Sequence, residues 1–260
     1  MESRIMPEIM HEYRPLSLKE IREAYKKNHA IVGHVTKVNS ENSTLSVKLG
    51  NGIFATLPFV DVTFYDWTWE DGNCIVPKTM PDLVGKNIQV KVIHMGQTNI
   101  LVSRKKAQKG AVKHLQKCTT CTGIVLEVHR THALIDIGNG VRGFVKLSQI
   151  AKHVGNAEEF FTVGDIEKFA ILGKKEGNMF ELSYKNMFAP YIPEVYPKHT
   201  VMIGTVTYQS SNTTYYIRFT PNVYGILQVK AGTPTIKSGE VVTVKVSGHN
   251  ENGLYVQLKK

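Results

Sequence analysis

The 260-residue sequence contains only three cysteines, and it has no apolar run near the roughly 18 residues that a membrane-spanning helix requires. So few cysteines exclude a disulfide scaffold and are typical of a reducing compartment. Residues 1–15 include acids and no apolar stretch, so we expect no secretory signal. These absences favour a cytoplasmic protein without a membrane partner.

Sequence motifs for catalysis and metal binding are equally scarce. We find no phosphate-binding glycine loop, no nucleophile elbow and no His-Glu-x-x-His pattern. Cys118 and Cys121 have the spacing of half a zinc site, but a structural site needs four ligands and the remaining Cys74 is distant. We therefore expect no enzyme, no metal, no cofactor and no small-molecule substrate.

Positive charge is what the sequence has in excess. It holds 32 Lys and Arg against 22 Asp and Glu, a net charge of +10. The excess is spread along the chain rather than held in a tail, which is typical of several folded modules that are each slightly basic. This charge favours a polyanionic partner, although a basic protein that binds no polyanion has the same composition.

One order of strands and turns occurs three times, over residues 29–104, 117–186 and 199–260. Each copy opens with a Gly-x-Val strand, continues through two strands joined by a short turn that contains glycine in the first two copies, and ends with two more strands. Apolar and polar residues alternate in these strands, which indicates that one face of each strand is buried. Five short antiparallel strands in about 70 residues predict a closed Greek-key barrel of the oligonucleotide/oligosaccharide-binding (OB) type.

Residues 1–28 form an extension with one predicted helix. Ser17 and Glu20 make a capping box at its start, because each side chain can bond the backbone of the other. Leu18, Ile21 and Tyr25 then form an apolar stripe, which we expect to pack on the first barrel or on a partner.

Two linkers separate the three copies. Residues 105–116 predict a helix, whereas residues 187–198 contain three prolines and predict an extended, semi-rigid segment. The predicted fold is therefore mostly β: three tandem five-stranded OB-fold barrels with a short N-terminal helix and a linker helix.

The second copy resembles the S-one RNA-binding domain family, named for the largest protein of the bacterial small ribosomal subunit. The resemblance is carried by TGIVLEV (122–128), ALIDIG (133–138), GVRGFVKLSQI (140–150) and FTVGDIEKFAIL (161–172). It extends well over residues 29–186 and weakly over residues 199–260. It implies a five-stranded barrel and the binding of single-stranded RNA.

The resemblance also implies where RNA would bind. The family stacks bases on aromatic residues of strands two and three, beside a histidine and further basic residues. In the second copy the strand-two positions hold Thr131 and Leu134, which are not aromatic. The positions that the resemblance assigns to RNA, with their basic and aromatic neighbours, are His132, Arg142, Phe144 and Lys146 in the second copy and Tyr216, Arg218, Tyr224 and Gln228 in the third.

Several of these assignments have an alternative. Phe144 could fill the barrel instead of facing outward, and Tyr215 could be the outward residue in place of Tyr216 after a slip of one position. Lys146 could be an ordinary solvated lysine. The first copy has only polar residues or proline at the corresponding positions, so its barrel is better suited to contacts with protein.

Residues 64–72 of the first copy hold both tryptophans, Trp67 and Trp69, together with three acids. The acids repel phosphate, so this segment does not suit RNA. It either anchors a protein partner, since tryptophans are frequent hot spots, or folds back over its own barrel.

Two functions follow from these observations. The leading hypothesis is a non-enzymatic, cytoplasmic protein that binds single-stranded RNA, alone or with the ribosome or another large assembly, in translation or RNA metabolism. The alternative is a structural or adaptor protein whose barrels contact other proteins in a large assembly such as a virion.

Overall fold

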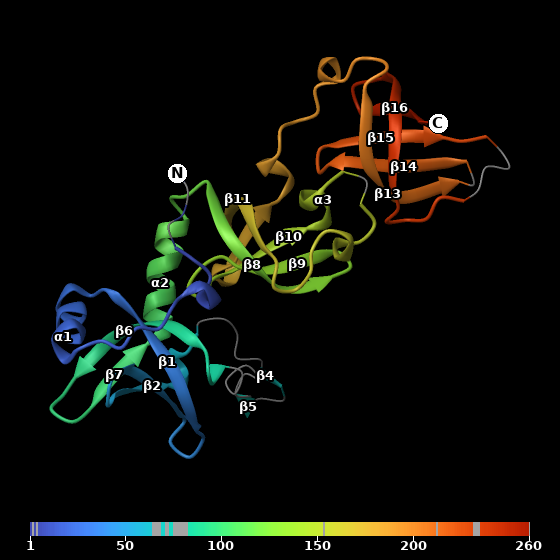
Figure 1. Cartoon of the computed structure of the whole chain (residues 1–260). Helices are drawn as coiled ribbons and strands as arrows, with labels where there is room; N and C mark the ends of the chain where they lie inside the picture. The colour runs from blue at the N-terminus through green and yellow to red at the C-terminus, as the bar shows by residue number, and fades with distance from the viewer. Residues whose placement is uncertain are drawn as a thin grey trace. The chain divides into compact units, whose positions relative to one another are not determined.

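Three closed five-stranded barrels follow one another along the chain (Figure 1), which confirms the predicted fold class. This computed structural model describes the chain apart from residues 2, 4, 64–68, 71–72, 75–82, 153, 212, 231–234 and 260. For residues 9, 69, 70, 73, 74 and 208 it describes the backbone only.

The first barrel has the strand order β1-β2-β3-β7-β6. Its strands are β1 (Ala30–Asn39), β2 (Thr44–Gly50), β3 (Ile53–Pro58), β6 (Asn87–Met95) and β7 (Ile100–Ser103). A separate two-stranded sheet, β4 (Trp69–Glu70) with β5 (Asn73–Cys74), lies between β3 and β6 in the sequence.

The second and third barrels have the orders β10-β12-β11-β8-β9 and β13-β14-β15-β17-β16. The strands of the second are β8 (Thr120–His129), β9 (His132–Asp136), β10 (Arg142–Lys146), β11 (Ile166–Lys174) and β12 (Phe180–Ser183). Those of the third are β13 (Val201–Ser211), β14 (Thr214–Thr220), β15 (Val223–Gln228), β16 (Val241–His249) and β17 (Leu254–Leu258).

One parallel pairing completes the ring in the first barrel and one in the third. The first three strands pair antiparallel in sequence, and the first strand also pairs with the fourth. The third strand then meets the fifth in parallel, as β3–β7 and as β15–β17. This crossover is the Greek-key closure of an OB-type barrel, and it leaves each barrel strand with a neighbour on both sides.

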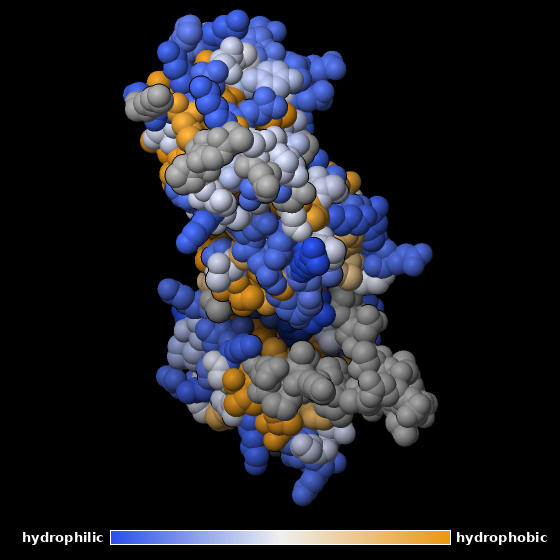
Figure 2. All heavy atoms as spheres, turned by 90° about the vertical axis from the view of Figure 1, so that its right-hand side faces the viewer, coloured by the Kyte–Doolittle hydropathy of each residue, from blue (hydrophilic) through white to orange (hydrophobic). Residues whose placement is uncertain are grey.

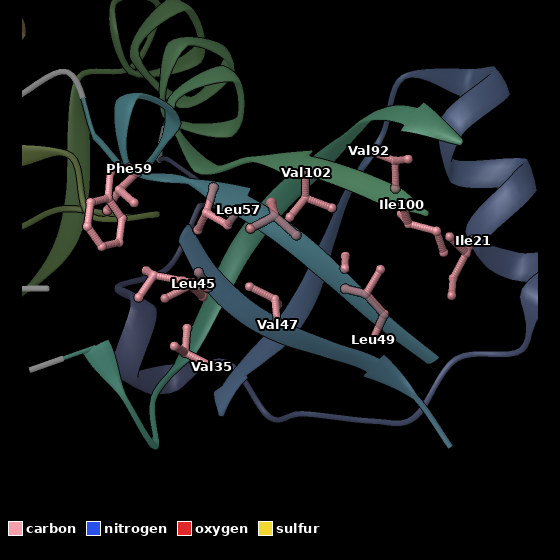
Figure 3. Close-up of a cluster of buried hydrophobic side chains, with 14 residues drawn as sticks. Ile21, Val35, Leu45, Val47, Leu49, Leu57, Phe59, Val92, Ile100 and Val102 are labelled. Atoms are coloured by element: carbon pink, nitrogen blue, oxygen red, sulfur yellow. The ribbon is translucent and has the colours of Figure 1, made fainter. Parts of the chain in front are cut away.

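Strand alternation builds the core of the first barrel (Figure 3). Leu45, Val47 and Leu49 of β2 have no exposed surface, while the residues between them reach the outside. Ile21 belongs to the same cluster although it comes from helix α1 (Leu18–Lys27). Helix α1 therefore packs on the first barrel through Ile21, whereas Leu18 and Tyr25, the other two residues of the predicted stripe, remain exposed.

Helix α1 begins with the predicted capping box. The Ser17 Oγ accepts from the Glu20 backbone at 3.3 Å, and a carboxylate oxygen of Glu20 accepts from the Ser17 N–H at 2.7 Å. These bonds and the Arg14 guanidinium, 2.8 Å from the other carboxylate oxygen, lower the pKa of Glu20 to about 2. Asn28 ends the helix in a left-handed conformation.

Helix α2 (Arg104–Leu115) starts one residue earlier than predicted, because Ser103 caps it by accepting from the Lys106 N–H at 3.1 Å. The third strand of the second copy stops at Lys146 and is followed by the single turn α3 (Leu147–Ile150).

The proline-rich segment after the second barrel is not wholly extended. It contains a 3-10 turn at Pro193–Val195, and another, Lys185–Met187, comes just before it. Pro193 fits the first position of its turn, since that position donates no intrahelical hydrogen bond. Three more 3-10 turns span Glu8–Met10, Phe59–Asp61 and Ala157–Glu159, and a kinked one spans Glu176–Asn178.

The chain divides into two compact units. The first combines Met1–Gly123 with Asp136–Arg142 and Lys174–Phe180. The second combines Ile124–Ile135, Gly143–Gly173 and Glu181–Lys260.

We expect the change Ile21→Ala to destabilise the first barrel by about 2–5 kcal/mol, because it removes a fully buried side chain. Leu18 is 42% exposed on the same helix, so Leu18→Ala is the matched control and should change stability by less than about 0.5 kcal/mol. Hydrogen exchange of the β1 and β2 amides in urea measures both. Equal protection in the two variants would contradict the assignment of Ile21 to the core.

Candidate nucleic-acid interface

Alternation along β10 separates a core face from an outer face. Gly143 and Val145 are buried, whereas Arg142 and Phe144 are half-buried and Lys146 is exposed. Successive side chains of a strand point to opposite sides, so Arg142, Phe144 and Lys146 share the outer face. The alternative in which Phe144 fills the barrel is therefore wrong.

Lys146 is not a freely solvated lysine. Its ammonium lies 5.6 Å from the centroid of the Phe144 ring and 3.1 Å from a carboxylate oxygen of Glu181. An exposed cation–π contact is worth about 0.5–1 kcal/mol and an exposed ion pair about 0–1 kcal/mol. Contacts this weak hold the lysine beside the ring, and an incoming phosphate can still compete for it.

Two imidazole rings stack at the turn between β8 and β9. His129 and His132 have ring centroids 4.7 Å apart and an interplanar angle of 21°. His132 lies on the outer side of β9, and β9 neighbours β10 in the barrel. His132 was predicted from the sequence, whereas His129 was not, because it follows a Glu-Val pair that carries no local signal of this stack.

The third barrel brings together its predicted aromatic residues. Tyr215 is 1% exposed in the core, so Tyr216 is the residue on the outer side of β14. Its ring centroid lies 6.1 Å from that of Tyr224, which is itself only 7% exposed. Burial raises the pKa of Tyr224. Gln228 is exposed at the end of β15.

Arg218 differs from the exposed phosphate ligand that the sequence predicts. Its guanidinium carbon lies 3.7 Å from the centroid of the Phe160 ring, and burial lowers its pKa. One of its terminal nitrogens is buried, and no hydrogen-bond partner for it is found among the described residues. Phe160 thus occupies the flat face of the guanidinium that would otherwise stack on a base.

Comparison with known proteins identifies a domain family for the second barrel. Residues 115–185 match the family model described as "S1 RNA binding domain". The chain is 26% identical over 264 residues to small ribosomal subunit protein bS1 of Staphylococcus aureus strain COL, covering 93% of this chain and 64% of that protein. It is 32% identical over 130 residues to polyribonucleotide nucleotidyltransferase of Brachyspira hyodysenteriae, covering 48% of this chain and 18% of that protein.

Residues 115–185 are an S1 domain. The resemblance seen in the sequence is thereby confirmed. The chain spans less than two thirds of the length of both of these relatives. A solved structure of a multidomain protein with nucleic-acid-binding domains from Streptococcus pneumoniae covers 89% of this chain and 73% of its own, at 13% identity and a TM-score of 0.28. A likeness this low carries no weight for function.

A buried ion pair touches the S1 domain. Arg104, 8% exposed at the start of α2, donates to both carboxylate oxygens of Glu8, at 2.7 and 2.6 Å, and to the Val62 carbonyl at 3.0 Å. Its neighbour Gln108 donates to the Gly140 carbonyl of the S1 domain. A Cβ at Gly140 would collide with the Arg104 guanidinium, so glycine is needed there for space as well as for its φ of 69°.

Asp136 of the S1 domain lies beside this pair and is 5% exposed. It accepts from the backbone N–H groups of Glu8, at 3.0 Å, and Gly138, at 2.9 Å. Burial and the Glu8 charge raise its pKa to about 6, against the opposing effects of these bonds and of Arg104. No local pattern in the sequence indicates this contact, because Glu8 and Asp136 are 128 residues apart.

The predicted partner-binding residues separate into three cases. Ile21 is buried in the first barrel, so its assignment to a partner surface is corrected. Leu18 and Tyr25 are 42% and 41% exposed on α1. Trp67 lies outside the described residues, and only the backbone of Trp69 is described, as part of β4.

Metal binding finds no support in the described part of the chain. Cys118 and Cys121 are buried free thiols, and burial raises the pKa of Cys121 to about 12, which keeps it protonated. No group of three or more His, Cys, Asp or Glu residues that could hold a metal is found among the residues described. No helix within those residues is long and apolar enough to cross a membrane.

Asp136→Asn tests the buried carboxyl. The folded pKa of Asp136, about 6, lies above its ordinary 3.8, so its contribution to stability is complete below pH 4 and is lost as the pH rises through 6. Between pH 4 and pH 7 the free energy of unfolding of the wild type should therefore fall by about 2–3 kcal/mol more than that of the variant. The asparagine side chain has one acceptor oxygen instead of two, so the variant loses one hydrogen bond at every pH. A difference between the two proteins in how stability changes with pH therefore reports the titration of Asp136. Thermal unfolding from pH 4 to 7 measures it, and parallel profiles would contradict the raised pKa.

Proposed function

We propose that this chain is a non-enzymatic protein that binds single-stranded RNA through the outer face of its S1 domain. The observation that carries the proposal is the alternation of Arg142, Phe144 and Lys146 along the outer side of β10. The description of the matching family as RNA-binding and the similarity to a protein of the small ribosomal subunit support it. We propose translation or RNA metabolism in the cytoplasm as its setting, with the ribosome or another large assembly as a second partner.

The chemistry of this face favours unpaired nucleotides. A half-buried phenylalanine offers a flat surface on which a base can stack, but a base within a duplex has no free face to present. The Lys146 ammonium beside the ring can contact the phosphate of the nucleotide stacked there. The His129–His132 stack on the neighbouring strand adds a second flat, polar surface.

The three barrels contribute unequally to this proposal. Tyr216 gives the third barrel one outward ring beside Tyr224, whereas Arg218 is covered by Phe160. The first barrel has no aromatic residue at the corresponding places. RNA bound to the S1 domain would raise the local concentration of RNA at the third barrel, so weak sites on linked modules would reinforce each other.

Protein docking is the second candidate function, and one observation on the first barrel favours it. Leu18 of α1 and Phe54 of β3 are 42% and 51% exposed, and both line one pocket of about 220 Å³. Exposed apolar side chains around a hollow are typical of a contact site for protein. This candidate concerns a different barrel and is compatible with RNA binding by the S1 domain.

The variant Phe144→Ala should weaken binding of a single-stranded oligonucleotide by about 1–3 kcal/mol, because a stacked base loses its platform. Arg142→Ala with Lys146→Ala should also flatten the slope of log K against log salt by about 0.7 for each phosphate that is no longer neutralised. Fluorescence anisotropy at several salt concentrations measures both effects.

Matched controls lie on the first barrel and its helix. Phe54→Ala removes an exposed ring of the first barrel, and Lys19→Ala with Lys26→Ala removes two exposed charges; neither change should alter RNA affinity beyond about twofold. Thermal unfolding verifies that Phe144→Ala is folded. A wild type without salt-dependent RNA affinity would refute the proposal and leave protein docking as the function to pursue.

A further inference from the structure

A pocket of about 480 Å³ lies within the second compact unit, and none of its described lining residues belongs to β10. The segment after the last strand of the S1 domain lines it with Asn186, Phe188, Pro190 and Tyr191. Lys152 follows α3, Asn222 comes from the β14–β15 turn and Glu251 from the β16–β17 turn. Its volume is in the range of sites that bind small ligands.

Side-chain hydrogen bonds hold the walls of this pocket in place. The amide nitrogen of Asn222 lies 2.9, 3.0 and 3.1 Å from the carbonyl oxygens of Lys185, Phe188 and Ala189, which share its two N–H donors. The Lys152 backbone N–H donates to the Pro221 carbonyl at 3.0 Å. A linker with this many bonds to the turn beneath it presents a preformed site, and a preformed site binds without a large cost of ordering.

Two aromatic rings of the linker are fixed as well. The Tyr191 hydroxyl lies 2.9 Å from the Gly253 carbonyl and 3.0 Å from that of Asn250, and it can donate to either. The Phe188 ring meets Tyr184 edge to face at 5.0 Å and remains 36% exposed. Phe188 is thus a positioned ring that solvent still reaches.

The polar groups of the pocket carry both signs of charge. Lys152 is exposed, and no ion-pair partner for it is found among the described residues. The Glu251 carboxylate in the same lining repels a bare phosphate but accepts hydrogen bonds from a ribose hydroxyl or a base amino group. A ring, an ammonium and a carboxylate together match a nucleotide better than they match an inorganic anion or an apolar peptide.

Among the described residues, the hollow on the first barrel lacks the combination of a ring, an ammonium and a carboxylate that lines the linker pocket. On the face drawn in Figure 2, hydrophilic and hydrophobic residues are interspersed. The hollow beside Leu18 and Phe54 has apolar side chains around it, but Arg22 is its only charged lining residue among those described.

From these contacts we propose that the linker pocket binds one nucleotide of single-stranded RNA, with its base against Phe188 and its phosphate at Lys152. This site rests on the proposed function and extends it. It assigns to the aromatic and proline-rich linker a direct part in binding RNA.

The test uses the full chain and an oligouridylate labelled at one end. Phe188→Ala should weaken its binding about 5-fold to 100-fold, and Phe188→Leu should do nearly the same, because leucine keeps apolar bulk but has no flat face. Lys152→Ala should reduce the salt slope by about 0.7. The controls are Ile192→Ala and Lys198→Ala, which change exposed residues of the same linker outside the pocket and should leave the affinity unchanged.

Crosslinking gives a second readout that does not depend on stability. An oligonucleotide that carries 4-thiouridine should crosslink within residues 186–191 of the wild type, and Phe188→Leu should abolish that product while crosslinks at the β10 face persist.

The outcomes separate the two proposals. If the wild type binds the oligonucleotide and Phe144→Ala weakens it, but the pocket variants bind normally and residues 186–191 do not crosslink, the linker pocket is refuted and the S1 site stands. A wild type that fails to bind any single strand overturns both. A pocket that takes up a protein segment instead would leave RNA affinity untouched in every pocket variant, which also refutes the inference.

Discussion

Each strand of a closed five-stranded barrel gives one face to an interior that has room only for side chains, and every other feature of this molecule depends on that constraint. A residue's position along its strand, even or odd, decides whether it stabilises the fold or can meet a ligand. Val145 fills the S1 barrel and Phe144, next to it, does not. A shift of one residue would exchange them, burying Arg142 and Lys146 and leaving two charges without water. The free-energy cost of burying these two charges therefore determines which residues of β10 face outward.

The same constraint explains which features the sequence could predict. On β10 the sequence left the register open, because Phe144 and Val145 are adjacent apolar residues and either one could fill the barrel. Tyr215 and Tyr216 are chemically identical, and the structure was needed to show that only the first is buried. The capping box of α1 was predictable because both partners lie within three residues.

Pairings between distant residues escaped prediction for a physical reason. Glu8 and Arg104 are 96 residues apart, and the sequence around each residue gives no indication of its partner. Arg218 looked like a phosphate ligand because its strand position is outward, and that part is correct; the ring of Phe160 that covers it comes from a different barrel. Asn222 stands in the β14–β15 turn, where no local pattern indicates that its amide bonds the linker carbonyls. Local sequence patterns predict secondary structure and the face on which a residue lies. Contacts between distant residues depend on the tertiary structure, which these patterns do not describe.

Magnitudes decide how these surfaces would act together. One stacked base is worth about 1–3 kcal/mol, whereas a micromolar dissociation constant requires about 8 kcal/mol. Phe144 alone cannot supply that, and neither can the weakly held Lys146. Micromolar binding of a single strand therefore needs several modest sites joined in one chain, where each later contact is made at the high local concentration set by the first. The linker pocket, which offers the Phe188 ring and the Lys152 ammonium, would shorten the unbound stretch of RNA between sites, and this raises the local concentration further.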